Sequence, residues 1–140
     1  MINLEEANAI IAGTIAKGCD LSLKPLTVAV VDAGGWLVAF QRANGSPNLR
    51  PAIAIGKAAG AIGLGVSSGR IGTMALERPH FVEAIQPMAP QGLVPVAGGL
   101  NIVDATGRLV GAVGVSGDTS DNDEICAKAG ILAAGLTPQE

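Results

Sequence analysis

The chain has 140 residues and a formal net charge of −3; 49% of its residues are hydrophobic and 15% are charged. This length and apolar content predict one folded domain over residues 1–140 and exclude a disordered chain. The charge balance, without Lys/Arg clusters, excludes a basic surface for nucleic acid. No apolar run reaches the roughly 18 residues of a membrane span, and the first residues lack a signal-peptide pattern. We therefore expect a cytoplasmic protein without nucleic-acid or membrane partners.

The first predicted element is an amphipathic helix over residues 4–17. Asn3 followed by Glu6 matches a capping box, in which each side chain accepts a backbone N–H of the other residue. Apolar residues then recur at helical spacing, and Gly18 marks the end of the pattern.

A hairpin follows, with strands predicted at Thr27–Val31 and Trp36–Gln41. Its turn contains Asp32, which can accept hydrogen bonds from its own backbone, and glycine, which supplies the positive φ that hairpin turns need. Along the second strand, alternate residues from Trp36 end in Arg42. Arg42 is therefore expected at the end of an otherwise apolar row.

The segment from about 49 to 64 predicts a helix that is buried on most sides. Lys57 is its only charged residue beyond Arg50. Its glycines each cost about 1 kcal/mol of helix propensity relative to Ala, so we expect them to allow tight packing against another helix. These glycines are Gly56, Gly60 and Gly63.

The second half of the chain predicts short helices, then strands, then a final helix. A helix is expected over residues 70–78 with Pro79 ending it, and a turn over 81–86. Strands are expected at Val94–Ala97, Leu100–Val103 and Leu109–Val115. Asp121 and Glu124 repeat the capping-box pattern before a last helix that should end near Gly135.

The two predicted hairpins have nearly the same turn sequence. Residues 30–38 and 102–110 are identical at six of nine positions, including Asp32 and Asp104. The order of elements is αββααβββα, which predicts an α/β (α+β) domain with an antiparallel sheet of about five strands flanked by helices. The low charge and high apolar content also favour a buried subunit interface, so we expect a homo-oligomer.

Arg42 and Lys57 are the sharpest candidates for ligand binding. A cation among Ala and Ile either extends to solvent or faces an anion. Together with Asp32 at the sheet edge, they could form a small polar pocket for a carboxylate-bearing molecule. The second hairpin leads into Ser116 and Asp118, which we expect to line the same kind of pocket.

His80, the single histidine, could be an axial haem ligand, although a surface or packing role is the simpler alternative. The acidic residues from Asp118 to Glu124 fit helix capping better than a cation site, because the calcium-loop pattern is absent. Cys19 and Cys126 have no metal-like spacing and are expected to be reduced residues of the core type.

Several of these segments together carry a family resemblance, and they are Val30–Gly35, Leu37–Val38, Arg42, Lys57–Ala58, Gly98–Gly99, Asp104, Gly107, Val110–Gly117 and Asp123–Glu124. On these residues the chain resembles the GlcG/HbpS family of haem-binding-type proteins, which also includes the carboxy-terminal domain of PduO-type corrinoid adenosyltransferases. The resemblance covers essentially the whole chain and implies a profilin-like sandwich, usually assembled into dimers or larger rings. It also implies haem binding, which some members show.

Two functions from different classes remain open. The first is an accessory protein of a catabolic or redox pathway that binds a small anionic ligand, with haem as the candidate cofactor. Arg42 and Lys57 would then pair with carboxylates, and His80 would ligate iron. The alternative is a small catabolic enzyme, an isomerase or lyase, that acts on a carboxylate-bearing metabolite. Arg42 or Lys57 would hold the carboxylate, and Asp118, Glu124 or His80 would act as the base. A third possibility is an oligomeric scaffold protein that binds no ligand.

Overall fold

Five strands form one antiparallel sheet in the order β2-β1-β4-β3-β5 in the computed structural model, which describes residues 1–139. The strands are β1 (Thr27–Asp32), β2 (Leu37–Arg42), β3 (Gly99–Val103), β4 (Leu109–Ser116) and β5 (Thr137–Pro138). The helices are α1 (Leu4–Asp20), α2 (Arg50–Leu64), α3 (Ser68–Glu77), α4 (Pro79–Ile85) and α5 (Ser120–Ala133), with a 3-10 turn η1 (Gln86–Met88). The predicted α+β class with an antiparallel five-stranded sheet is confirmed.

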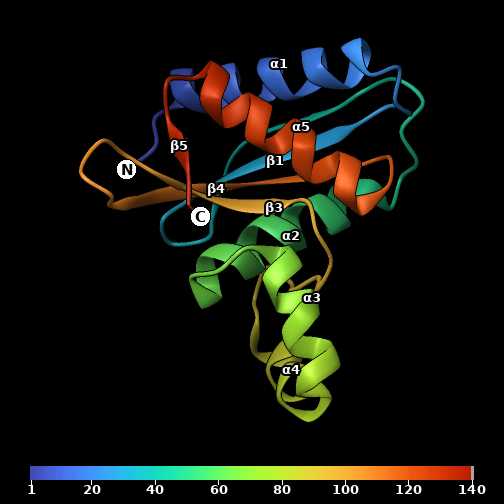
Figure 1. The fold of residues 1–140 in the computed structure, drawn as a ribbon, viewed down its shortest axis with the longest axis vertical. Helices are drawn as coiled ribbons and strands as arrows, with labels where there is room; N and C mark the ends of the chain where they lie inside the picture. The colour runs from blue at the N-terminus through green and yellow to red at the C-terminus, as the bar shows by residue number, and fades with distance from the viewer. Residues whose placement is uncertain (140) are drawn as a thin grey trace.

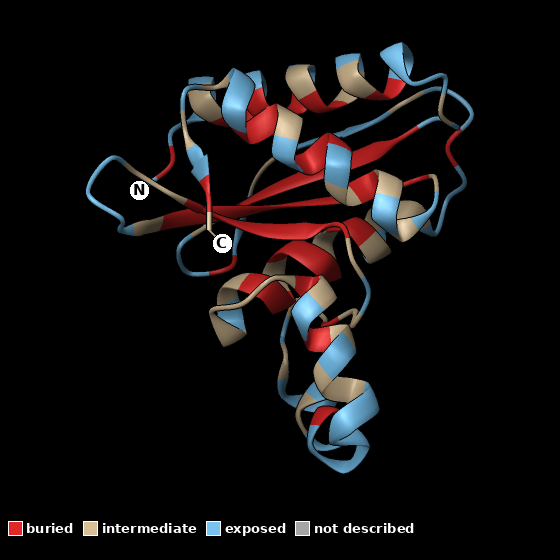
Figure 2. Ribbon diagram, in the orientation of Figure 1, coloured by how far each residue is buried: buried red, intermediate tan, exposed pale blue. Residues whose placement is uncertain are grey.

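The helices cover the two faces of the sheet unequally. Helices α1 and α5 lie side by side on one face, whereas α2 alone crosses the other (Figure 1). Helices α3 and α4 form an arm that extends away from the sheet, and much of the arm surface is exposed (Figure 2). The largest apolar core lies between the sheet and the α1–α5 layer.

The twin hairpins are confirmed as equivalent units. The Asp32 carboxylate accepts the backbone N–H groups of Gly34 and Trp36, and the Asp104 carboxylate accepts those of Thr106 and Arg108. The two hairpins join where β1 pairs with β4, so the sheet centre consists of one strand from each. The capping box at the start of α1 is confirmed as well.

The backbone of helix α2 lies directly against the backbone of the sheet, because the strand residues that face the helix there are glycines. A Cβ atom on Gly114 would overlap the carbonyl oxygen of Ala54, and one on Gly99 would overlap that of Lys57. The expectation that the glycines of α2 pack against another helix is wrong. Gly56 and Gly60 instead lie against the extended segment that contains Leu93 and Val94, and the Gly63 position is open.

The strand predicted at Val94–Ala97 is wrong, and β5 is the fifth strand instead. Pro95 has no N–H for a strand ladder. Leu93 and Val94 pack against α2 and residues 95–97 pack against α3, so the segment does not pair in the sheet. The predicted turn at 81–86 is also wrong, because Pro79 occupies the first turn of a helix, where its missing N–H costs nothing.

The last helix begins earlier than the sequence pattern predicts. Its N-cap is Thr119, whose hydroxyl accepts the backbone N–H of Asn122, so the predicted cap at Asp121 is wrong. Cys126 is buried and Cys19 is exposed, so only Cys126 is of the core type, and neither forms a disulfide. Within residues 1–139, no single helix is long and apolar enough to cross a membrane; α2 and α3 pass that test only as a pair bent by 76°.

Candidate functional site

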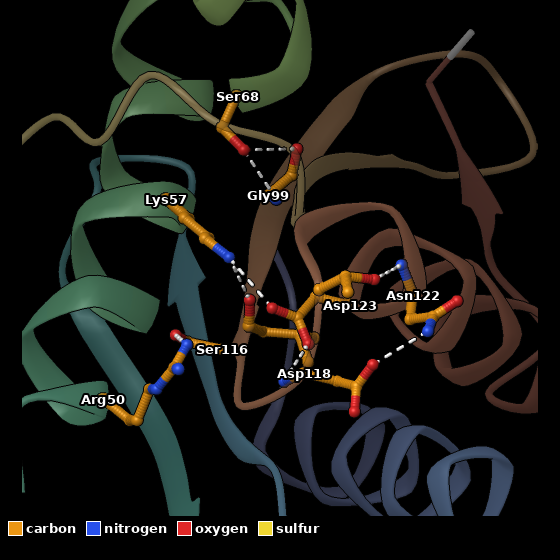
Figure 3. Close-up of polar contacts among 10 residues, drawn as sticks. Arg50, Lys57, Ser68, Gly99, Ser116, Asp118, Asn122 and Asp123 are labelled. Carbon is orange, nitrogen blue, oxygen red and sulfur yellow. Dashed lines mark hydrogen bonds and ion pairs between the residues drawn. The ribbon is translucent and has the colours of Figure 1, made fainter. Parts of the chain in front are cut away.

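A buried ion pair lies at the carboxyl end of β4. The Lys57 ammonium donates to the Val115 carbonyl oxygen at 2.8 Å and to the Asp123 carboxylate at 3.2 Å. The two side chains reach this point from α2 and α5 respectively (Figure 3). Burial lowers the pKa of Lys57, while the neighbouring Asp123 partly opposes that shift. The anion that faces Lys57 is therefore a residue of the same chain.

Asp123 also organises the loop that leaves β4. Its other carboxylate oxygen accepts the backbone N–H of Asp118 at 2.9 Å. The Asp118 carboxylate in turn accepts the Asn122 amide and the backbone N–H of Lys24. The Asn122 hydrogen bond, followed by backbone N–H donors, lowers the pKa of Asp118 to about 2. Asp118 is thus held as a carboxylate that connects this loop to the segment before β1.

Two arginines flank one row of the sheet on its α2 side. Thr27 pairs with Arg42 on one side and Ser116 on the other, so these three side chains share a face. The Arg50 guanidinium, at the start of α2, donates to the buried Ser116 hydroxyl at 3.0 Å. Among residues 1–139, neither arginine forms an ion pair with a carboxylate. This row is a cationic surface beside two buried hydroxyls.

A separate apolar groove lies beside the turn of the first hairpin. Its volume is about 320 Å³, and it runs between that turn, the second half of α2 and the η1 segment. The indole of Trp36 borders it and is 56% exposed. The residues that line the groove are Ala33, Gly34, Gly35, Trp36, Ala59, Gly60, Ile62, Gly63, Leu64, Ile85, Met88, Ala89, Pro90, Gln91, Gly92 and Leu93.

A second groove, of about 500 Å³, lies between α5, β5 and the start of α3. Charged side chains line it, unlike the first groove: Asp121, Glu124 and Lys128. Burial, followed by the charge of Asp121, raises the pKa of Glu124, whereas Lys128 opposes the shift. No group of three or more His, Cys, Asp or Glu side chains within residues 1–139 is arranged to hold a metal ion.

The structure brings only some of the expected site residues together. Arg42, Lys57, Ser116 and Asp118 lie near the end of the sheet where β4 finishes. Asp32 lies at the opposite end of β1, about 17 Å away for a six-residue strand. The exposed His80 lies on the arm, in the first turn of α4.

Sequence reasoning missed three features of these sites. Arg50 lies at the start of a helix, where a basic residue is electrostatically unfavourable, and that was an available signal for a special role. Asp123 was assigned to helix capping, whereas its side chain is buried against Lys57. The groove beside Trp36 forms only when the η1 segment folds back onto α2, which no local pattern indicates.

Comparison with known proteins gives one family. The model of the haem degrading protein HbpS-like family matches residues 2–132. An uncharacterized 15.0 kDa protein from the dhaT–dhaS intergenic region of Citrobacter freundii is 29% identical over 130 residues, covering 93% of this chain and 89% of the relative.

Solved structures have the same fold. A complex of PduOC with haem has a TM-score of 0.86 at 18% identity and covers 99% of both chains. HbpS has a TM-score of 0.80 at 26% identity, covering 94% of this chain and 88% of its own. Protein ORFY of Klebsiella pneumoniae has a TM-score of 0.85 at 26% identity, covering 96% and 90%. The family match over nearly the whole chain and these shared folds lead to one conclusion: the chain belongs to the HbpS-like family.

Proposed function

We propose that this chain is a binding protein for a flat, mainly apolar ligand of the tetrapyrrole class, and that the ligand lies in the groove beside Trp36. The observation that carries the proposal is the exposed indole at the edge of an apolar groove. The exposed part of the ring gains no burial free energy on folding, so that area is still available to a ligand. An indole face is a good stacking surface for a planar ring.

The walls of the groove suit such a ring. Ile62, Leu64 and Leu93 provide apolar contact, and the glycines of the hairpin turn and of α2 let the ligand approach the backbone closely. The volume is near the lower limit for a small-molecule pocket, so part of a larger ring would stay in solvent. The haem complex of PduOC, a relative in fold, supports this choice of ligand class.

The groove fits the haem ring but not nitrogen ligation of its iron. Haem iron is held by His, Cys, Tyr or Met, and Met88 alone among these lines the groove. No cation lines it either, so the propionates of the ring would face water. We therefore assign to this chain the binding of the tetrapyrrole ring, and we assign no reaction to the iron.

The test is a titration with haemin, followed by the Soret absorbance. Wild type should show a saturable spectral change, and Trp36→Ala should weaken binding by about tenfold or more because the stacking surface is lost. Phe81→Ala is the matched control, since this exposed ring lies on α4 outside the groove. No saturable change in wild type, or equal affinity for Trp36→Ala, would contradict the proposal.

A second candidate function is binding of a small carboxylate metabolite at the row that contains Arg42 and Arg50. The favouring observation is that two arginines without carboxylate partners flank Thr27 and Ser116. In an enzyme at this row, Asp118 would be a poor general base, because its pKa of about 2 is far from neutral pH. Glu124, whose pKa is raised, lines the other groove.

Thermal shift with a panel of organic acids tests this second function. An acid that binds the row should raise the Tm of wild type, and Arg42→Ala should remove that rise. Arg108→Ala, in the exposed turn of the second hairpin, is the control and should keep it. If no acid raises the Tm, or if Arg42→Ala responds as wild type does, the row is not an anion site.

We also propose that two copies associate through β2. This strand is at the edge of the sheet and exposes Leu37 and Phe40. An antiparallel strand can pair with a second copy of itself about a two-fold axis and bury such side chains. Sedimentation equilibrium should give a dimer for wild type and for the control Leu132→Lys, on α5, and a monomer for Phe40→Lys. A monomeric wild type, or a dimeric Phe40→Lys, would overturn the assignment.

A further inference from the structure

We infer that the groove beside Trp36 recognises the face of its ligand and not a metal, so that a metal-free tetrapyrrole binds as tightly as the iron-loaded one. This inference rests on the proposed function, because it concerns the same groove. It differs in saying where the binding free energy comes from.

The chemistry of the lining residues is the first observation. Apart from the Trp36 indole N–H, only Met88 and Gln91 bring a side-chain heteroatom to the groove. The lining contains no His, Cys, Tyr, Lys, Arg, Asp or Glu. A coordinated iron needs a strong donor such as imidazole or thiolate on at least one side of the ring, and these residues supply none.

The position of His80 is the second observation. Its helix contributes Ile85 to the groove, and Ile85 follows His80 by five residues. At 100° and 1.5 Å per residue, the two side chains lie about 140° apart around α4 and about 7.5 Å apart along it. His80 therefore lies on a different face of the helix, consistent with its exposure to solvent.

The thiols are no closer to the groove than the imidazole. Cys126 is buried in the core between the sheet and the α1–α5 layer, on the face of the sheet opposite α2. Cys19 is exposed near the end of α1, in that same layer. Neither residue is part of the groove lining.

Met88 remains as the one donor in the groove. Its side chain is 75% exposed, and a thioether is a neutral, weak ligand without the imidazole that accompanies it in cytochromes c. A flexible methionine at the rim of an apolar groove adapts its shape to a ring and adds contact area. We assign to Met88 that contact role, which leucine can also perform.

Apolar and stacking contacts with the face of the ring therefore supply the binding free energy. Trp36 provides a stacking face, Ile62, Leu64 and Leu93 provide apolar walls, and none of these contacts depends on the atom at the ring centre. The class of ligand follows: planar tetrapyrrole macrocycles, with or without a metal.

The chain carries its own reporter for the test, because Trp36 is its single tryptophan. Quenching of Trp36 emission is measured during titration with haemin and with metal-free protoporphyrin, and visible absorbance provides a second readout. The dissociation constants of the two rings should agree within about threefold. Met88→Leu, which keeps the volume and removes the sulfur, should change the affinities for haemin and for the metal-free ring by the same factor. His80→Ala, outside the groove, should bind haemin within about twofold of wild type.

Two results would overturn the inference. One is haemin binding at least about tenfold tighter than the metal-free ring. The other is a loss of haemin affinity in Met88→Leu or His80→Ala with the metal-free ring unaffected. If neither ring causes saturable quenching, the proposed function itself fails. The two failures are therefore distinguishable within the same titrations.

Discussion

Lys57 and Asp123 meet 3.2 Å apart at the end of β4, with side chains that are only 2% and 1% exposed. Lys57 belongs to α2 and Asp123 to α5, so the pair connects helices that cover opposite faces of the sheet. A charged pair in this position is compensated by its hydrogen bonds to Val115 and Asp118. Removing either partner leaves a buried charge without its counterion.

Asp123→Ala should therefore destabilise the fold by about 3–5 kcal/mol in urea unfolding. Asp121→Asn is the matched control: it removes an exposed carboxylate from the same helical turn and should cost less than about 1 kcal/mol. Combining Lys57→Met with Asp123→Leu removes both charges and should recover part of the loss. Equal stability of Asp123→Ala and wild type would mean that the pair contributes nothing.

The stability of the fold should rise with pH in the alkaline range because of Lys57. Burial lowers its folded pKa below the ordinary 10.5, so the unfolded chain binds more protons between these two values. Unfolding free energy should therefore increase from the lowered pKa up to about 10.5, and be independent of this group below that window. Lys57→Met should lack the increase. The same slope in both proteins would contradict this assignment.

Asp118 should act in the acid range, where stability should again rise with pH. Its folded pKa of about 2 is below the ordinary 3.8, so its stabilising effect is complete above 3.8 and is lost as pH falls towards 2. Asp118→Asn should flatten the stability profile across that interval. Asn122→Ala, which removes the principal donor to the carboxylate, should flatten it in part. If Asp118→Asn and wild type lose unfolding free energy equally as pH falls through this interval, other carboxylates dominate there, and the assignment to Asp118 is wrong.

Glycine at the sheet centre should not tolerate a methyl group. In Gly114→Ala the new Cβ would overlap the Ala54 carbonyl oxygen, so α2 would have to move, at a cost of at least about 3 kcal/mol. Gly63→Ala is the control within α2, because nothing lies near its Cβ, and it should stabilise by up to about 1 kcal/mol. Thermal unfolding of both variants, with Tm falling in one and rising in the other, checks this.

Local chemistry explains what could be predicted from the sequence. The capping box at Asn3 and the turns at Asp32 and Asp104 depend on residues within four positions of each other, and all three are confirmed. The strand predicted at Val94–Ala97 is wrong because its residues pack on helices and not into the sheet: Val94 lies against α2, and residues 95–97 lie against α3. An apolar run does not indicate which surface it will cover.

The candidate sites depended on distant partners and were harder to predict. For Lys57 the sequence leaves two alternatives open, solvent or the anion of a ligand. The anion that the structure places beside it is Asp123, 66 residues later in a helix whose acidic residues are expected to cap it. Arg50 was overlooked beside it, although Ser116, its hydrogen-bond partner, was among the expected site residues. The groove beside Trp36 combines three segments that are separated in sequence, and only their packing creates it.

The backbone contact of α2 with Gly99 and Gly114 has a consequence for how a ligand would enter. At Ala54 and Lys57 the helix lies directly on the strands, with no side chain between the two backbones whose rotamer could adjust, so it cannot roll or slide there to admit a ligand. Helix α2 continues unbroken from these contacts to Leu64, so its groove-lining half is held in place, and ligand association should lose little conformational entropy and proceed in a single kinetic phase.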